Sequence, residues 1–218
     1  MHFLSHYYTE LPQNDPYFTA GLIIPDLTPR FARVYNSIIK NSVSNFEGDL
    51  GLIQLGVKRH YEGDKWFHNS EPFLHHQSLA LEAFLKEGLN RNRLRLSVLA
   101  HLTVELMLDR QLVLENEALC EAYYGVINNC RNDILTAWFN GLGLLEEKKD
   151  FLVKFNFFRE RRFLFLFKGI EHIVYGLNRI YGTATHTSFT DDEKARFEAA
   201  LNNIDTVMRY SWQELLKG

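Results

Sequence analysis

The placement of its prolines is the feature that most limits what this chain can fold into. Of the five prolines, four precede residue 30 and the last is Pro72. Proline interrupts helices because it lacks an N–H donor and its ring clashes with the preceding turn, so a helix expected over Thr19–Asn41 is predicted to break around Pro25 and Pro29. Farther along, apolar residues recur at the spacing of amphipathic helices, and period-two alternation typical of strands is not evident. The sequence predicts an all-α fold, a single-domain helical bundle over residues 1–218.

Local signals divide this helical region. An Asn-rich stretch, LNRNR, ends the predicted helix QSLALEAFLKEGL, and Gly141 with Gly143 indicates the end of a later one. The following segment, EEKKDFLVKF to NRIYG, is predicted to form one long helix or two helices separated near Gly169. Thr190 and Glu193 have the spacing of a capping box, so the last helix is predicted to begin there.

Composition and charge exclude several classes of protein. The two cysteines, Cys120 and Cys130, lack the spacing of a metal-binding pair, and so few cysteines indicate an intracellular chain. A net charge of −3 argues against a general nucleic-acid-binding protein, which is normally basic. No signal peptide and no uncharged stretch long enough to span a bilayer is recognisable. We therefore expect a cytoplasmic protein that binds neither nucleic acid nor membrane.

Acidic and imidazole side chains recur at helical spacing in the first half of the chain. Residues four apart lie on the same face of a helix, so His60 and Asp64 share a stripe, and His68 lies one turn farther along it. Glu105 and Asp109 share a stripe of a second, strongly apolar helix. Two carboxylates on one buried stripe repel each other unless a cation or a proton lies between them.

Three further residues extend this set. His101 lies four residues before Glu105, Asp26 follows the apolar run GLIIP, and His6 in MHFLSH is another candidate. A single histidine or a single i,i+4 pair is more often structural, and it is the convergence that favours a metal held between helices. Oxygen and imidazole ligands without thiolate suit Mn²⁺, Fe²⁺ or Zn²⁺. Such an ion lowers the pKa of bound water and polarises a phosphoryl oxygen, so a metal-dependent hydrolase is the leading hypothesis.

Four short phrases, taken in order, resemble the acyl carrier protein phosphodiesterase family. They are MHFLSH, GLIIPD, GVKRHYEGDKWFH and ELMLDRQ, similar in turn to N-F-L-A-H, G-N-x-x-x-D, G-x-x-x-H-R-x-I-D-x-x-T-D and D-x-x-W-D-H-F, the last with one further residue before its Trp. The matching residues are Phe3, Leu4, His6, Gly21, Asp26, Gly56, His60, Asp64 and Asp109, with Glu105 in place of an Asp.

The resemblance implies an HD-like, Mn²⁺-dependent phosphodiesterase that releases 4′-phosphopantetheine from acyl carrier protein. It implies that His6, Asp26, His60, Asp64 and Asp109 bind the metal or orient the residues that bind it. Acyl carrier protein, which is acidic, or a small phosphodiester would be the partner, and Mn²⁺ is the first choice of metal, with Fe²⁺ and Zn²⁺ as alternatives.

Five other residues belong to this hypothesis. Glu105 and His68 are candidate catalytic residues, as metal ligands, as a general acid or as residues that orient a ligand. Arg30, Lys58 and Arg59 are candidates to bind a phosphate, although a surface salt bridge is the default for such residues.

Six positions depart from the family pattern. Leu22 stands in place of Asn, Tyr61 in place of Arg, His68 in place of the last Asp, Glu105 in place of an Asp, and Arg110 with Gln111 in place of His and Phe. A histidine at position 68 shifts the metal preference toward Zn²⁺ or Fe²⁺. The departures therefore bear more on the substrate than on the metal-hydrolase scaffold.

A second hypothesis is a non-catalytic helical interaction protein with a relic or structural metal site. Its interaction surface would be the Phe-rich segment that carries Lys154, Arg159, Arg161, Arg162 and Lys168. Such a segment suits an acidic partner such as a carrier protein, or a homodimer interface. The alternative is a core helix whose basic side chains extend to water.

Overall fold

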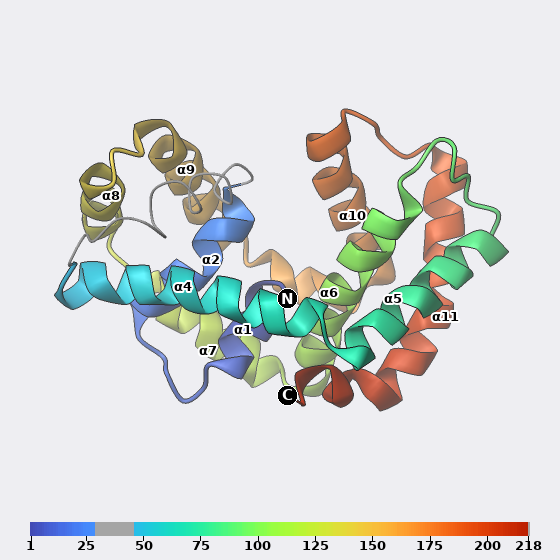
Figure 1. Cartoon of the computed structure of the whole chain (residues 1–218), viewed down its shortest axis with the longest axis horizontal. Coiled ribbons are helices and arrows are strands. Elements are labelled where there is room, and N and C mark those ends of the chain that lie inside the picture. The colour runs from blue at the N-terminus through green and yellow to red at the C-terminus, as the bar shows by residue number, and fades with distance from the viewer. Residues whose placement is uncertain (29–45, 218) are drawn as a thin grey trace. The chain divides into compact units, whose positions relative to one another are not determined.

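The regular elements in the described part of the chain are all helical. The computed structural model describes residues 1–28 and 46–217. Its helices are α1 (Phe3–Thr9), α2 (Pro16–Leu27), α4 (Gly48–His68), α5 (Glu71–Lys86), α6 (Leu96–Glu115), α7 (Glu117–Asn128), α8 (Asn132–Gly141), α9 (Leu145–Arg161), η2 (Phe163–Lys168), α10 (Ile170–Thr185), α11 (Asp191–Ser211) and η3 (Trp212–Leu216) (Figure 1). The all-α prediction is confirmed.

The predicted helix ends correspond to specific backbone features. The Thr190 hydroxyl accepts a hydrogen bond from the Glu193 amide at 3.2 Å, and the Glu193 carboxylate accepts one from the Thr190 amide at 2.8 Å. This capping box begins α11, as predicted. Gly169 precedes α10, but α9 already ends at Arg161, because Arg162 takes the left-handed conformation with φ 49°. The segment predicted as one helix or two is therefore two helices joined by the short η2.

Helix α2 corrects the prediction made from Pro25. The helix begins at Pro16, where the Asp15 carboxylate accepts hydrogen bonds from the amides of Tyr17 and Phe18, and it continues through Pro25 to Leu27. The break expected at Pro25 is wrong, because proline removes only its own donor and the Thr28 amide still donates to Ile24 at 3.1 Å. The rest of the predicted helix, with Pro29, lies outside the described residues.

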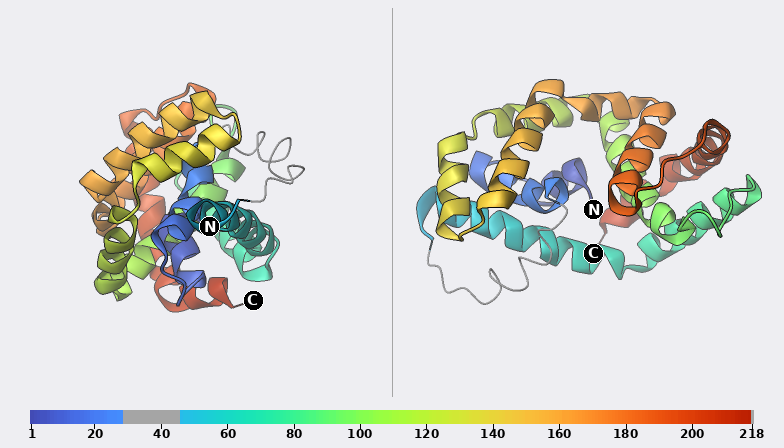
Figure 2. Two further views of the ribbon diagram at one scale, coloured as in Figure 1. Left: turned by 90° about the vertical axis from the view of Figure 1, so that its left-hand side faces the viewer. Right: turned by 90° about the horizontal axis from the view of Figure 1, so that it is seen from above.

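The chain divides into two compact units that are each built from separated segments. Unit 1 comprises Met1, Lys65–Glu117 and Leu164–Gly218, and unit 2 comprises His2–Asp64 and Ala118–Phe163. Helix α4, continuous in Figures 1 and 2, contributes its residues up to Asp64 to unit 2 and the remainder to unit 1. The single domain expected over residues 1–218 stays a prediction.

Unit 1 is a packed group of four long helices. Helix α5 packs against α6 and α11, and α10 packs against the same two helices. Phe197 forms part of the core with Phe84 and Phe189, whose ring centroids lie 5.0 and 4.5 Å from its own, respectively. The polar residues of α6 are therefore held within an apolar framework.

Unit 2 carries the helices of the N-terminal segment. Helix α1 packs on α2, α2 on α9, and α9 on α8. The ring of Tyr123 on α7 lies 5.2 Å from that of Tyr7 on α1, and Tyr124 lies 5.5 Å from Phe158 on α9. In the ranges that the structure describes, none of the helices has the length and apolar character needed to cross a membrane.

Candidate metal centre

Two glycines let α2 and α4 approach each other very closely. A Cβ atom on Gly21 would lie 2.3 Å from the carbonyl oxygen of Ile53, and one on Gly56 would lie 2.1 Å from that of Phe18. Both positions therefore accept only glycine, which has no Cβ atom. This contact brings the backbone of α2 next to His60, one turn beyond Gly56 on α4.

The close approach determines which nitrogen of the His60 ring carries the proton. Its Nδ1 lies 2.9 Å from the carbonyl oxygen of Leu22 and must donate, since a carbonyl only accepts. In the neutral ring, Nε2 therefore carries the lone pair, which is the arrangement of a metal-binding histidine. This Nε2 lies 3.3 Å from Asp64 and 3.9 Å from Asp26.

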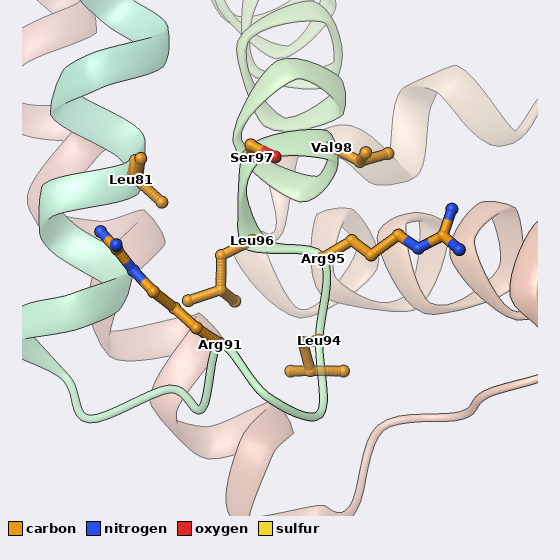
Figure 3. A pocket seen from close by; sticks show the side chains of 7 residues that line it. All are labelled: Leu81, Arg91, Leu94, Arg95, Leu96, Ser97 and Val98. Carbon is orange, nitrogen blue, oxygen red and sulfur yellow. The ribbon is translucent and has the colours of Figure 1, made fainter.

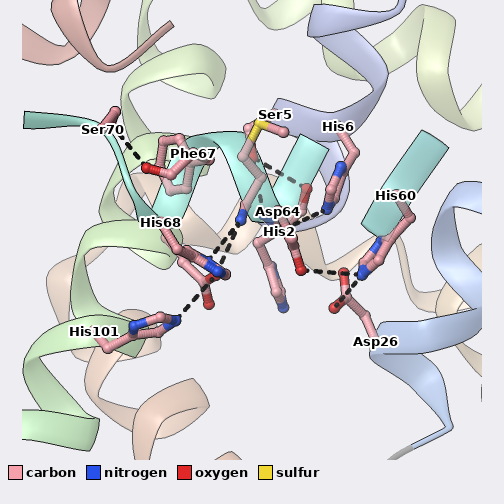
Figure 4. A network of polar contacts seen from close by, with 12 residues as sticks. His2, Ser5, His6, Asp26, His60, Asp64, Phe67, His68, Ser70 and His101 are labelled. Atoms are coloured by element: carbon pink, nitrogen blue, oxygen red, sulfur yellow. Dashed lines mark hydrogen bonds and ion pairs between the residues drawn. The ribbon is translucent and has the colours of Figure 1, made fainter. Parts of the chain in front are cut away.

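Asp64 links two stacked imidazoles (Figure 4). One carboxylate oxygen lies 3.2 Å from Nε2 of His6, and the other faces Nε2 of His60. The two rings stack with their centroids 4.1 Å apart. Both histidine side chains are buried, whereas Asp26 and Asp64 are about one fifth exposed, at 19% and 23%. The carboxylates thus give the cluster its access to water.

The pKa values of the two histidines in this cluster shift in opposite directions. Burial lowers the pKa of His6 to about 3, aided by the neighbouring His60 and opposed by Asp64. Burial acts in the same direction on His60, but the carboxylates of Asp26 and Asp64 outweigh it and raise its pKa. Burial would raise the pKa of Asp64, yet the hydrogen bonds to both imidazoles contribute to a pKa far below the usual range. Asp64 is therefore ionised and His6 is neutral.

His6, Asp26 and His60 form the first candidate metal group. One ligand atom from each lies within 4.8 Å of the others. Two imidazoles and one carboxylate form the donor set of many iron and manganese centres, so the residues present fit such an ion. Asp64 contacts both histidines, one with each carboxylate oxygen. It could serve as a further ligand or as the residue that orients the two rings.

His68, His101 and Glu105 form a second candidate group, in unit 1. Glu105 lies 2.8 Å from Nε2 of His68 and 3.6 Å from Nε2 of His101, and 3.0 Å from the amino nitrogen of Met1. Burial would raise the pKa of Glu105, but the Met1 amino group and the two imidazoles hold it well below its ordinary value. An ionised carboxylate does not donate a proton, so the remaining roles for Glu105 are to bind or orient a ligand.

Asp109 and Arg110 lie on α6 next to this group but not in it. Asp109, predicted as a metal ligand, is fully buried and belongs to neither group of ligand atoms. Arg110 donates to Asp205 on α11 at 3.1 Å and to the carbonyl oxygens of Phe167 and Lys168. The arginine that replaces the family's histidine therefore joins α6 to α11 and η2.

The basic residues near the predicted site are engaged in surface ion pairs. Arg59 lies 3.2 Å from Glu10 and 3.4 Å from Glu62, and Lys58 lies 3.7 Å from the same Glu62. These are the default contacts expected for such residues. Arg30 lies outside the described residues.

The Phe-rich helix α9 is mainly a core helix. Phe151, Phe155 and Phe158 are fully buried, and Arg159 donates to the carbonyl oxygen of Cys130 at 2.7 Å. Phe157 is the exception, at 54% exposed. The structure therefore supports the core alternative for most of this segment.

One pocket of the described chain lies at the start of α6, and its lining includes no residue of either metal group. Figure 3 shows its lining residues, which are Leu81, Arg91, Leu94, Arg95, Leu96, Ser97 and Val98. The candidate chemistry is therefore in the two polar clusters and not in this pocket.

No family model, curated protein or solved structure matches this chain. The resemblance to the acyl carrier protein phosphodiesterase family rests on the four sequence phrases and stays a prediction.

The structure adds one residue to the predicted site. The sequence placed His101 on the same helix face as Glu105 but did not predict it as a catalytic residue or metal ligand. In the structure, it forms a candidate metal group with His68 and Glu105. Its four-residue spacing from Glu105 was the signal in the sequence.

Proposed function

We propose that the protein is a metal-dependent phosphoric ester hydrolase whose metal is held by His6, Asp26 and His60. The observation that carries the proposal is the convergence of these three ligand atoms within 4.8 Å. The imidazole and carboxylate donors suit Mn²⁺, Fe²⁺ and Zn²⁺, and Mn²⁺ is the first candidate because the four family-like phrases imply it. When bound, the ion supplies an activated water and polarises a phosphoryl oxygen.

The chain's own residues contribute orientation and charge. The Leu22 carbonyl holds His60 with Nε2 directed at the carboxylates. His6 has a pKa of about 3, so its ring needs no deprotonation to bind metal near neutral pH. Asp64 is ionised and would bind the metal, orient the two rings or position the attacking water.

The substrate class follows from the four family-like phrases. We propose a phosphodiester of the kind that joins 4′-phosphopantetheine to acyl carrier protein, or a small phosphodiester, on an HD-like scaffold. On α9, Arg161 lies 5.5 Å from the ring of the exposed Phe157 and is a candidate contact for an acidic carrier protein.

The test is hydrolysis of bis(p-nitrophenyl) phosphate with added Mn²⁺ by protein purified without a polyhistidine tag. We expect turnover in the wild type, loss of at least 100-fold as an order-of-magnitude estimate in His60→Ala, and unchanged turnover in His172→Ala. His172 is an exposed histidine on α10 and controls for nonspecific metal binding. Release of phosphopantetheine from holo-carrier protein, followed by mass spectrometry, then tests the substrate.

The second candidate is the non-catalytic interaction protein. It is favoured by the contacts that Asp64 and the two histidines already make with one another. A structural network, with or without a structural metal, predicts no turnover and strong destabilisation in His60→Ala. Bound manganese with His60-dependent turnover would exclude it.

A further inference from the structure

The second group has a geometry that a small cation fits. His68 is the last residue of α4, and His101 with Glu105 lies one helical turn apart on α6. Ligand atoms about 2.0–2.1 Å from a tetrahedral zinc ion lie roughly 3.3 Å from one another. The Glu105 oxygen lies 2.8 and 3.6 Å from the two Nε2 atoms, on either side of that value.

The group is supported on one side and accessible on another. The ring of Phe73, buried at 1% exposed, lies 5.0 Å from the His68 ring and 4.9 Å from the His101 ring. The side chains of His68 and His101 are 27% and 33% exposed, so an ion can enter from water. Figure 4 shows the two imidazoles turned toward the same region. The rings are thus held without being enclosed.

The charge of the group also attracts a cation. The Glu105 side chain is nearly buried, and the nitrogen of the Met1 amino group lies 3.0 Å from its carboxylate and 3.4 Å from Nε2 of His68. A positive group is therefore already drawn to the space that the three ligand atoms surround. A divalent ion would compete for the same carboxylate oxygen with twice the charge.

We propose that His68, His101 and Glu105 bind a zinc ion of their own, separate from the metal of the proposed hydrolase site. Two imidazoles and one glutamate are a zinc donor set that leaves a fourth position for water. Magnesium and calcium prefer oxygen ligands and fit the two imidazoles poorly. The proposal does not depend on the hydrolase activity, because it concerns different side chains and a different ion.

The experiment measures zinc bound per chain after equilibrium dialysis, on protein purified without a polyhistidine tag. His101→Gln removes a half-exposed ligand with little change in size, and we expect it to bind one zinc fewer than the wild type. The same loss of one zinc ion is expected when His101→Gln is introduced into His60→Ala. The comparison therefore tests this group even if the proposed hydrolase site at His6, Asp26 and His60 binds no metal. His172→Gln, at an exposed position, is expected to keep the wild-type stoichiometry.

A spectroscopic measurement identifies the ligands independently. Co²⁺ loaded in place of zinc should show the visible absorption of a four-coordinate ion in His60→Ala, and this absorption should be lost when His101→Gln is added to that variant. Circular dichroism of the metal-free variants verifies that each of them folds. Equal zinc content in His101→Gln and the wild type, or zinc lost only in His60→Ala, would overturn the proposal.

Discussion

His6 and His60 share Asp64 and stack on each other, yet their pKa values move in opposite directions. His6 is deeply buried, and its single close carboxylate does not compensate for the loss of water. His60 faces both Asp26 and Asp64, which together outweigh the same burial. At the scale of single residues, the number of carboxylates near a buried imidazole decides whether the pKa of that histidine is raised or lowered.

The lowered pKa of His6 gives a pH dependence with a definite sign. Its folded-state pKa is about 3 and its ordinary value is 6.5, so the unfolded chain binds this proton more readily. Its contribution to stability is complete above pH 6.5 and is lost as the pH falls toward 3. We expect acidification through this window to reduce the free energy of unfolding of the metal-free wild type more than that of His6→Asn, measured by urea denaturation. Parallel pH profiles would contradict this assignment.

The raised pKa of His60 should depend on Asp64. Asp64→Asn removes a carboxylate 3.3 Å from Nε2, so we expect the pKa of His60 to fall. The measurement is an NMR titration of the histidine ring protons in metal-free protein. Glu62→Gln, the same chemical change at an exposed position of α4, should leave the His60 titration in place. An unchanged His60 titration in Asp64→Asn would show that Asp26 alone raises the pKa.

At the scale of elements, the close contact of α2 with α4 depends on the absence of a side chain at Gly21 and at Gly56. We expect Gly21→Ala and Gly56→Ala each to destabilise the protein by about 1–3 kcal/mol or more, because the new methyl group meets backbone carbonyls. Gly125→Ala on α7, where nothing lies within 4 Å, should instead stabilise by about 0.4–1 kcal/mol. Thermal or urea denaturation of the three variants measures the difference, and equal effects would exclude the close contact.

A buried polar contact joins α6 to α11. Asp205 accepts from Arg110 at 3.1 Å and from Gln111 at 2.7 Å, and all three side chains are buried. Asp205→Ala leaves the guanidinium without its carboxylate, so we expect a loss of about 3–5 kcal/mol in stability. Asp192→Ala, on the exposed face of the same helix, should cost about 0–1 kcal/mol. Similar losses in urea denaturation would mean that the buried pair is not intact.

At the scale of the whole molecule, metal binding should appear as added stability. A ligand that binds only the folded state stabilises it by about 2.7 kcal/mol at 100 times its dissociation constant. We expect Mn²⁺ to raise the Tm of the wild type and EDTA to reverse the change. His60→Ala should show no such rise, whereas His172→Ala should behave as the wild type. An equal rise in all three would indicate nonspecific binding.

The sequence was sufficient for the helices and for the pairs within them. The capping box at Thr190 and the i,i+4 pairs His60–Asp64 and His101–Glu105 are local, because helical geometry alone places residues four apart on one face. Pro25 was misjudged because a proline in the last turn of a helix removes a single hydrogen bond, and this does not end the helix.

The tertiary structure decided which of these residues meet. Contacts between helices depend on where the backbones approach, and only folding reveals that Gly21 and Gly56 bring Asp26 and the Leu22 carbonyl to His60. The same packing gathers His6, Asp26 and His60 in one group and His68, His101 and Glu105 in another, and it leaves Asp64 and Asp109 out of both. Spacing along one helix can be read from the chain, whereas the partner on another helix is chosen by the packing of surfaces far apart in sequence.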